Sequence, residues 1–392
     1  MRGNIDKGLL IVTLLLLLIG AVMIYSSTSV ITPLAAKKNL TSFYYFKRHL
    51  FTMAIGFFFM YLVYRMDPKL LVRLSMPLMI FSFILLLAVF IPKVGITVGG
   101  ARRWIRLWPS TFQPSELVKL SMVIFLARYL STSYFKKDSF ISFLIPVGIM
   151  AVFQIVFIIQ PDFGAFINLG ILTLTMLVLA GTRLKYIMFL STLAIPVIIK
   201  LAMKPYRLKR VLAFLDPWSD PQGSGFQLIQ SFIALGSGGI TGVGLGEGKQ
   251  KLSFLPEIHT DFIFSLIGEE LGFIGAVVVI LMFLFIFMRG ISIAGKLEIG
   301  FSYYLAVGLT IMIVLQALIN FAVATGVVPT KGLPLPFISY GGSSLLVNMT
   351  AIGILLNLSR GERPLKIKDT KEIIIEKKKA LLSVYGRGST SS

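Results

Sequence analysis

An aspartate stands at the point where a polar segment of the chain meets a long apolar one. Asp261 ends the sequence LPEIHTD, two residues after His259, and a mostly apolar run follows it. A carboxylate in this position serves as a general base when its pKa and geometry suit the reaction. Aspartate is also a preferred N-cap residue, so Asp261 could equally do no more than cap a helix. The residue pattern leaves both interpretations open.

A carboxylate and an ammonium group lie close together at the start of another apolar run. Glu116 and Lys119 are three residues apart and follow Pro114, a residue that fits the first turn of a helix. This spacing places both side chains on one helix face. Charged groups inside an apolar span are costly and indicate function by default. The alternative is a local ion pair.

Three arginines precede that pair in the sequence GGARRWIRLW. Arg102, Arg103 and Arg106 alternate with Trp104 and Trp108, a composition typical of the interface between membrane and water. Guanidinium groups bind phosphate in a bidentate manner, so the arginines are candidate contacts for a phosphate-bearing substrate. The alternative is an interfacial anchor.

Two further segments carry candidate polar groups. Asp162 in QPDFG either belongs to a site or caps the next helix. Residues 326–344 contain three prolines and four glycines, which predicts a re-entrant or capping loop with Lys331 as its only charge. Ser339 and Ser343 precede a predicted helix N-terminus, where hydroxyls and free N–H groups form an anion site. The alternative is a rigid turn that caps the helix.

The elements that position these residues are membrane spans. The chain has 392 residues, of which 56% are hydrophobic and 14% charged, with a mean hydropathy of +0.86. Soluble domains carry roughly 25% charged residues, so the composition indicates an integral membrane protein. The absence of cysteine excludes disulfides and cysteine metal sites, and two histidines do not suffice for a multi-histidine site. We therefore expect no protein-borne metal centre.

The net charge of +21 would indicate nucleic acid for a soluble protein. For a membrane protein it indicates anionic lipid, phosphate or basic cytoplasmic loops, and we expect membrane lipids and no nucleic acid as partners. Outer segments carry many cations despite the rule that disfavours them, so we expect an anionic partner at the outer face.

The hydropathy pattern predicts an all-α integral membrane protein of about ten spans, because each needs about 20 mostly apolar residues. Both termini are expected in the cytoplasm, with a long external loop 204–260 between the seventh and eighth spans and a basic cytoplasmic tail over 361–392. The predicted spans are 8–30, 48–64, 72–91, 115–132, 141–159, 164–182, 185–203, 261–288, 300–325 and 341–359.

Several long motifs resemble those of the SEDS family (shape, elongation, division and sporulation) of bacterial membrane glycosyltransferases. They are RRWIRL…FQPSELVKL, QPDFG, LDPWSDPQGSGFQLIQS, LPEIHTDFIFSLIGEELGFIG and PLPFISYGGSS. The resemblance covers essentially residues 8–360 and implies a SEDS-type polytopic domain over 1–360. QPDFG and VPTKGLPLPFISYGGSS are more similar to the cell-division branch, FtsW, than to the elongation branch, RodA, or the sporulation branch, SpoVE.

The resemblance implies polymerisation of peptidoglycan from lipid II at the outer face of the bacterial cytoplasmic membrane, at the septum. The implied partners are lipid II, the nascent glycan strand, a class B penicillin-binding protein that acts as transpeptidase, and other divisome proteins. It also implies that Asp261 is the catalytic aspartate. Glu116 and Lys119 match the family's polar pair, and Arg103 and Lys331 match its functional basic positions.

The residues and the resemblance together predict a mechanism. Asp261 deprotonates or orients the acceptor hydroxyl, and Glu116 positions Lys119 or shares the site with Asp261. The candidate substrate contacts are Arg102, Arg103, Arg106, Lys331, Asp162, His259, Ser339 and Ser343. No cofactor is required, although a divalent cation that bridges a carboxylate and the pyrophosphate is compatible with the sequence.

Two other classes of function compete with this prediction. A lipid II flippase or ion-coupled transporter would suit ten spans with buried Glu269 and Glu270, but such carriers place their sites near the bilayer midplane. A divisome scaffold without chemistry would not need a carboxylate at Asp261. Within the family, a RodA-type elongation polymerase is the alternative to the division enzyme.

Overall fold

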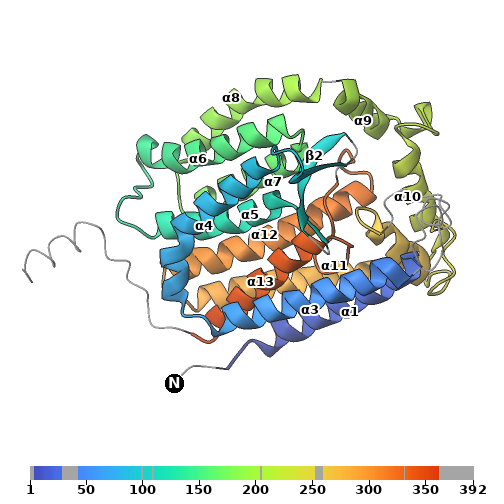
Figure 1. The fold of residues 1–392 in the computed structure, drawn as a ribbon, viewed down its shortest axis with the longest axis horizontal. Helices are drawn as coiled ribbons and strands as arrows, with labels where there is room; N and C mark the ends of the chain where they lie inside the picture. Colours follow the sequence, from blue (N-terminus) through green and yellow to red (C-terminus); the bar gives the residue numbers. More distant parts are fainter. Residues whose placement is uncertain are drawn as a thin grey trace, which may run out of the picture.

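Long helices that run side by side make up most of the fold (Figure 1). The computed structural model describes residues 4–28, 43–98, 100–107, 110–203, 205–251, 259–330 and 332–361. Within these ranges, seven helices are long and apolar enough to cross a membrane. They are α1 (Lys7–Thr28), α3 (Phe43–Arg65), α4 (Pro68–Ala88), α6 (Phe140–Ile159), α8 (Leu184–Ala202), α11 (Ile263–Gly295) and α12 (Phe301–Ala324).

Three shorter helices occupy the remaining positions at which spans are predicted. They are α5 (Pro114–Leu130), α7 (Phe163–Leu179) and α13 (Gly342–Leu358), each of 17 residues. A helix of this length extends about 25 Å, close to the thickness of the hydrocarbon core. The prediction of a helical membrane protein with about ten spans is therefore confirmed.

The two ends of the described chain lie at the same end of the helix bundle (Figure 1). The backbone N–H of Asp6, just before α1, donates to the hydroxyl of Ser359, just after α13, at 3.0 Å. This contact agrees with the even number of predicted spans. The orientation with both termini in the cytoplasm stays a prediction, and residues 362–392 of the predicted tail lie outside the described residues.

A small antiparallel sheet lies at the opposite end of the bundle, where the sequence pattern predicted no strand. It consists of β1 (Gly95–Val98), β2 (Ala101–Leu107) and β3 (Ser110–Phe112), in the order β1-β2-β3. Ile105 pairs with Gly95 on one side and with Phe112 on the other. The chain is predominantly helical, as predicted, and the sheet is an addition that the sequence analysis did not foresee, because alternating arginine and tryptophan is also typical of an interfacial belt. Alternation is equally the period of a strand, and Ala101 and Ile105 of β2 are both buried.

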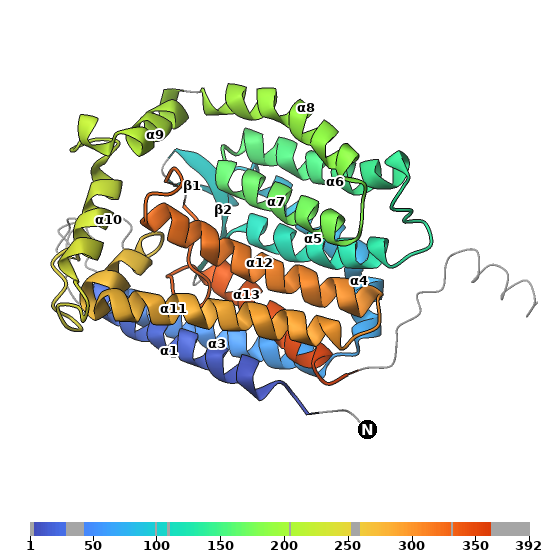
Figure 2. The same ribbon diagram turned by 180° about the vertical axis from the view of Figure 1, so that it is seen from behind.

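The predicted external loop 204–260 contains secondary structure of its own. It includes α9 (Pro205–Leu215), the short 3₁₀ helix η1 (Pro217–Ser219) and α10 (Phe226–Ser237). In Figure 2 these elements form an arc from α8 to α11 around the end of the bundle that carries the sheet. The Ser231 hydroxyl of α10 lies 2.6 Å from the Ser265 hydroxyl and donates to the Ala324 carbonyl, so α10 is fixed to α11 and α12.

The helix α11 is broken near its N-terminal end at Gly272, which has φ 69° and ψ −168°. A Cβ atom at this position would lie 2.2 Å from the backbone nitrogen of Gly242. The loop that follows α10 binds both sides of the break, because Phe273 N–H donates to the Gly239 carbonyl and Val243 N–H donates to the Glu269 carbonyl. The segment 263–271 is therefore held by this loop separately from the rest of α11.

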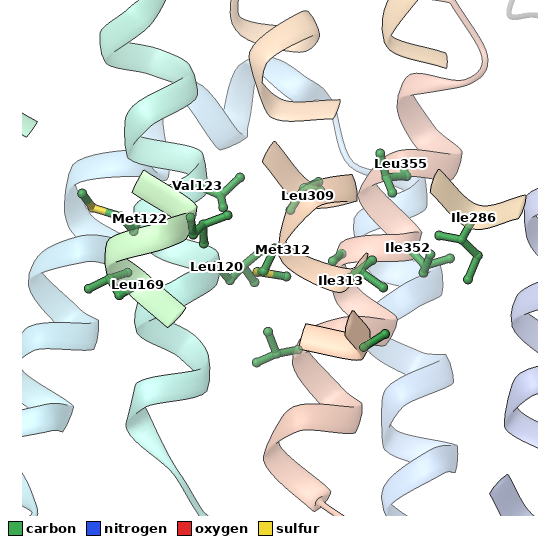
Figure 3. Close-up of a cluster of buried hydrophobic side chains, with 14 of the residues drawn as sticks. Leu120, Met122, Val123, Leu169, Ile286, Leu309, Met312, Ile313, Ile352 and Leu355 are labelled. Carbon is green, nitrogen blue, oxygen red and sulfur yellow. The ribbon is translucent and has the colours of Figure 1, made fainter. Parts of the chain in front are cut away.

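The centre of the bundle is a continuous apolar core around α5, α12 and α13. Figure 3 shows side chains of these helices together with Leu169 of α7 and Ile286 of α11. The outer helices also present apolar side chains outward, as Met188 and Leu193 of α8 do. Apolar residues both inside and outside are expected of helices that pack together in lipid.

Candidate functional site

The predicted catalytic pair Glu116 and Lys119 forms a buried ion pair in the first turn and a half of α5. The Lys119 Nζ and Glu116 Oε1 atoms are 2.9 Å apart, and each residue is 3% exposed. Lys119 also donates to the Gln316 side-chain oxygen of α12 at 2.6 Å. The Glu116 Oε2 atom is buried and has no hydrogen-bond partner among the described residues. The pair thus links α5 to α12 inside the bundle.

The segment between α12 and α13 enters the bundle, as the re-entrant loop prediction requires. The Gln316 Nε2 atom donates to the Pro334 carbonyl at 2.8 Å and to the Ser344 hydroxyl at 2.9 Å. Gln316 lies about 12 Å along α12 from its end at Ala324, at 1.5 Å per residue. Phe337 is also buried, and its carbonyl packs against Gly20 in α1. The loop therefore reaches the depth of Lys119.

Asp261 lies immediately before the N-cap position of α11. This helix begins at Ile263 with Phe262 as its N-cap, so the interpretation of Asp261 as the cap residue is wrong. The Asn320 side chain of α12 donates to the Asp261 carbonyl and to the Leu333 carbonyl, both at 2.8 Å. A Cβ atom at Gly332 would lie 3.0 Å from Asp261 Oδ2, so the backbone of the re-entrant loop approaches the carboxylate closely at this glycine.

His259 contributes to a cluster of aromatic rings next to Asp261. Its ring centroid lies 5.3 Å from that of Tyr45 and 5.8 Å from that of Tyr340. The backbone N–H of Tyr340 donates to the His259 carbonyl at 2.8 Å. Burial raises the pKa of Tyr340 to about 12, so its hydroxyl stays protonated at neutral pH. The cluster joins α3 and the re-entrant loop to the residues before Asp261.

Asp162 is the N-cap of α7 and also joins the polar groups at this end of the bundle. Its Oδ1 atom accepts from Ala165 N–H at 3.1 Å, and its Oδ2 atom accepts from the Gln113 amide at 3.3 Å. Arg103 Nη1 lies 3.9 Å from Asp162 Oδ1, and Arg103 donates to the Pro161 carbonyl. The Arg103 side chain is 32% exposed. The cap interpretation is confirmed, and a half-exposed cation stands beside the cap.

The two predicted serines are engaged in bonds within the protein. The Ser343 hydroxyl accepts from Gln113 N–H at 2.8 Å, which links α13 to the start of α5. The Ser339 hydroxyl accepts from Leu335 N–H and donates to the Thr260 carbonyl at 2.5 Å. Both residues are buried. Their hydroxyls therefore fix the loop and the segment before Asp261.

Of the other predicted basic residues, Arg102 and Arg106 lie within the described residues. Arg102 donates to the Phe90 carbonyl at 3.1 Å, and this bond fixes the sheet to the end of α4. Arg106 is exposed on β2. Lys331 and Trp108 lie outside the described residues. Arg210 of α9, which the sequence did not single out, donates to the Thr330 carbonyl at 3.3 Å.

Glu269 and Glu270 are buried and bound by the loop that follows α10. Glu270 accepts from the Ser26 hydroxyl at 2.6 Å and forms an ion pair with Lys251 at 3.2 Å. Glu269 accepts from the backbone N–H groups of Lys249 and Gln250. These carboxylates hold the loop that follows α10 against α1 and α11.

The amides Gln316 and Asn320 connect the predicted residues, although the sequence analysis did not single them out. They are four residues apart, so they share one face of the otherwise apolar α12. That spacing of two amides in a membrane helix is the signal that could have found them. Within the described ranges, no group of three or more histidine, aspartate or glutamate side chains could hold a metal ion.

The model of the FtsW/RodA/SpoVE family, described as cell cycle proteins, matches residues 7–364. The chain is 45% identical over 356 residues to the "Probable peptidoglycan glycosyltransferase FtsW" of Geobacter strain M18, covering 90% of this chain and 96% of that protein. It is 42% identical over 360 residues to the stage V sporulation protein E of Bacillus subtilis, with 91% and 98% covered.

Two solved structures share the arrangement of helices. One chain, from a study described as "Structural coordination of polymerization and crosslinking by a peptidoglycan synthase complex", is 28% identical with a TM-score of 0.76. The alignment covers 92% of this chain and 99% of that one. The rod shape determining protein RodA of Thermus thermophilus is 24% identical with a TM-score of 0.66, covering 93% and 98%. The second likeness supports the fold alone.

Proposed function

This chain belongs to the FtsW/RodA/SpoVE family of cell cycle proteins, the SEDS family that its motifs resemble, and from this premise we propose that it is a peptidoglycan glycosyltransferase. It polymerises lipid II into glycan strands for the septal cell wall. Relatives named as peptidoglycan glycosyltransferases match at more than 40% identity over nearly their full length. The assignment to septal synthesis rests on the FtsW names of these relatives.

The placement of Asp261 is the observation that supports this proposal most directly. The carboxylate precedes α11 at the end of the bundle that carries the sheet, and it lies against Gly332 of the re-entrant loop. Its backbone is held by Asn320. A carboxylate that is fixed in this way at the end of the bundle suits a general base.

In the proposed reaction, Asp261 takes the proton of the 4-hydroxyl of the acceptor sugar. The oxygen attacks the anomeric carbon of the donor glycan and forms the new glycosidic bond. The bond between that carbon and the pyrophosphate oxygen breaks, and undecaprenyl pyrophosphate leaves with its electron pair. Attack opposite the leaving group inverts the anomeric centre, as in inverting sugar chemistry.

The negative charge that develops on the pyrophosphate needs cations nearby. Among the candidates, Arg103 is half-exposed beside Asp162, and Arg106 is exposed. Lys331 is a further candidate from the family motif. Lys119 is committed to Glu116 and Gln316 inside the bundle, so we assign the buried pair to positioning rather than to direct contact with the leaving group.

The seven long apolar helices and the family membership identify a multi-pass membrane protein. Within the proposal, it resides in the bacterial cytoplasmic membrane and acts at the septum. Its partners are a crosslinking class B penicillin-binding protein and other divisome proteins. The likeness to a chain of a peptidoglycan synthase complex that couples polymerization with crosslinking supports the first of these partners.

A divalent cation is a separate part of the proposal. Because no cluster of three acidic or histidine ligands occurs in the described residues, such an ion would need oxygens of the pyrophosphate in addition to one carboxylate. Polymerisation that survives chelation by EDTA would remove the ion from the scheme.

The direct test uses the purified protein together with its crosslinking partner and labelled lipid II. We expect glycan polymer from the natural protein and none from Asp261→Ala or Asp261→Asn, with both variants still folded. Equal amounts of polymer from the folded variants would contradict the role of Asp261. Absence of polymer from the natural protein, combined with transfer of lipid II across liposomes, would support a flippase instead.

A further inference from the structure

We infer that Asn320 and Gln316 are positioning residues that join Asp261 to the buried Glu116–Lys119 pair, an inference that rests on the proposed function. Both amides lie on one face of α12, and each is at most 1% exposed. Each bridges a different part of the site. A carboxamide does not titrate near neutral pH, so neither residue is a candidate general base.

Asn320 fixes the backbone of the two segments that meet at the Asp261 carboxylate. Its single amide nitrogen donates to the Asp261 carbonyl and to the Leu333 carbonyl, each at 2.8 Å. These two carbonyls belong to segments that are remote in the sequence, one before α11 and one in the re-entrant loop. Because Gly332 adjoins Leu333 and faces the Asp261 carboxylate, the Asn320 amide sets the spacing between the carboxylate and the loop.

Gln316 makes the corresponding bridge one turn deeper. Its oxygen accepts from Lys119 at 2.6 Å, and its nitrogen donates to the Pro334 carbonyl and to the Ser344 hydroxyl. The bond from Lys119 fixes which end of the amide is the acceptor. Glu116 and Lys119 therefore act on the loop through Gln316, and the same loop reaches Asp261 through Asn320.

The chain offers a matched control for Asn320. Asn168 of α7 is also completely buried, and neither its Nδ2 nor its Oδ1 atom has a hydrogen-bond partner in the described part of the chain. Leucine has the same branching and number of side-chain heavy atoms as asparagine, and it has no donor. Asn320→Leu removes two bonds to the site, whereas Asn168→Leu removes none, so a comparison of the two separates positioning from the general effect of losing a buried amide.

The first measurement is steady-state polymerisation of lipid II. We expect Asn320→Leu to lower kcat at least tenfold while KM changes less than twofold, because a displacement of about 1 Å costs as much as 100-fold in rate. Asn168→Leu should leave both constants unchanged. A thermal unfolding curve of each variant shows whether it is folded. If Asn320→Leu does not fold, Asn320→Asp replaces it, because this substitution keeps the size and removes the amide donor.

The second measurement reports position without requiring turnover. The natural chain contains no cysteine, so the pair Asp261→Cys and Gly332→Cys can be introduced alone. Oxidation should join the two thiols readily, because the Gly332 position lies against the Asp261 side chain. Adding Asn320→Leu should slow disulfide formation at least fivefold, and adding Gln316→Met should slow it to a smaller extent. Adding Asn168→Leu should not change it.

The outcomes separate this inference from the proposed function. Disulfide formation at the same rate with and without Asn320→Leu would overturn the positioning role, whatever the activity. If the natural protein made no polymer, the proposed function would fail, and the disulfide rates would still decide whether Asn320 sets the spacing. Loss of kcat together with slower disulfide formation would support both.

Discussion

Lys119 and Gln316 are joined by a hydrogen bond of 2.6 Å that crosses the interior of the bundle from α5 to α12. With Glu116 at 2.9 Å, the ammonium is held from two sides where water is excluded. Desolvation of such groups is expensive, and it is offset only while the partners remain in place. The geometry makes α5 and α12 a single structural unit at the depth of the re-entrant loop.

Loss of either charge of the Glu116–Lys119 pair should lower the stability of the protein strongly. We expect Glu116→Gln or Lys119→Met alone to lower the free energy of unfolding by about 3–5 kcal/mol, because each leaves a buried charge without its counter-charge. The double variant should recover more than half of that loss. Denaturant unfolding in detergent measures all three. Additive effects of the two substitutions would show that the pair is not coupled.

The break in α11 predicts a second difference in stability. Gly272→Ala should lower the free energy of unfolding by at least about 2 kcal/mol, because the backbone conformation there is nearly exclusive to glycine. The new methyl group would also meet the Gly242 backbone. Gly148→Ala in α6 is the control, since a Cβ atom there has nothing within 4 Å, and we expect a change of about 1 kcal/mol or less. Thermal unfolding curves of both variants measure these changes, and equal losses of stability would contradict a special role of the Gly272 conformation.

Arg103 should affect catalysis more than stability. Its side chain is 32% exposed and its ion pair with Asp162 is 3.9 Å long, so we expect Arg103→Ala to cost less than about 1 kcal/mol of stability. Turnover of lipid II should fall at least tenfold if the guanidinium stabilises the leaving pyrophosphate. Arg183→Ala is a fair comparison, because Arg183 is also a half-exposed partner of an aspartate, Asp138, and belongs to no part of the proposed site. Equal turnover in the two variants would remove Arg103 from the mechanism.

The contact between Asp6 and Arg289 predicts a pH dependence. Burial alone would raise the pKa of Asp6, but hydrogen bonds from Arg289 and from Leu9 N–H outweigh it and place the pKa below its ordinary value of 3.8. The stabilisation is therefore present above pH 3.8 and lost as pH falls through the lower, folded value. We expect Asp6→Asn to cost about 1 kcal/mol at pH 7 and the difference from the natural protein to shrink progressively as the pH falls below 3.8. A difference in stability that stayed constant as the pH was lowered through the acid range would argue against this ionic contribution.

Local patterns in the sequence predicted the features that depend on neighbouring residues. The three-residue spacing of Glu116 and Lys119 was enough to predict their pairing, and Asp162 in QPDFG was a candidate cap that proved to be one. The sheet was missed because alternating arginine and tryptophan fit both an interfacial belt and a strand. Periodicity alone does not separate the two when the segment is short.

Contacts between segments that are far apart in the sequence could not be predicted from local patterns. The partners of Asn320 are backbone carbonyls of Asp261 and Leu333, and any residue has a carbonyl. Their meeting is set by the path of the re-entrant loop, which no local spacing reveals. The same holds for Lys251, which reaches Glu270 only because the loop after α10 folds back on α11.

The helix α8 touches α6 near its start, where the rings of Tyr186 and Phe189 meet Phe140. Farther along, Leu193, Ile195 and Val197 are exposed. A span with so few protein neighbours among the described residues depends on its own affinity for lipid when it leaves the ribosome and enters the bilayer. A single aspartate in its middle would cost roughly 2.5–3.5 kcal/mol of insertion that tertiary packing has little means to restore. Insertion of this protein into the membrane is therefore most sensitive to polar substitutions in α8, the helix that contributes least to the interior of the bundle.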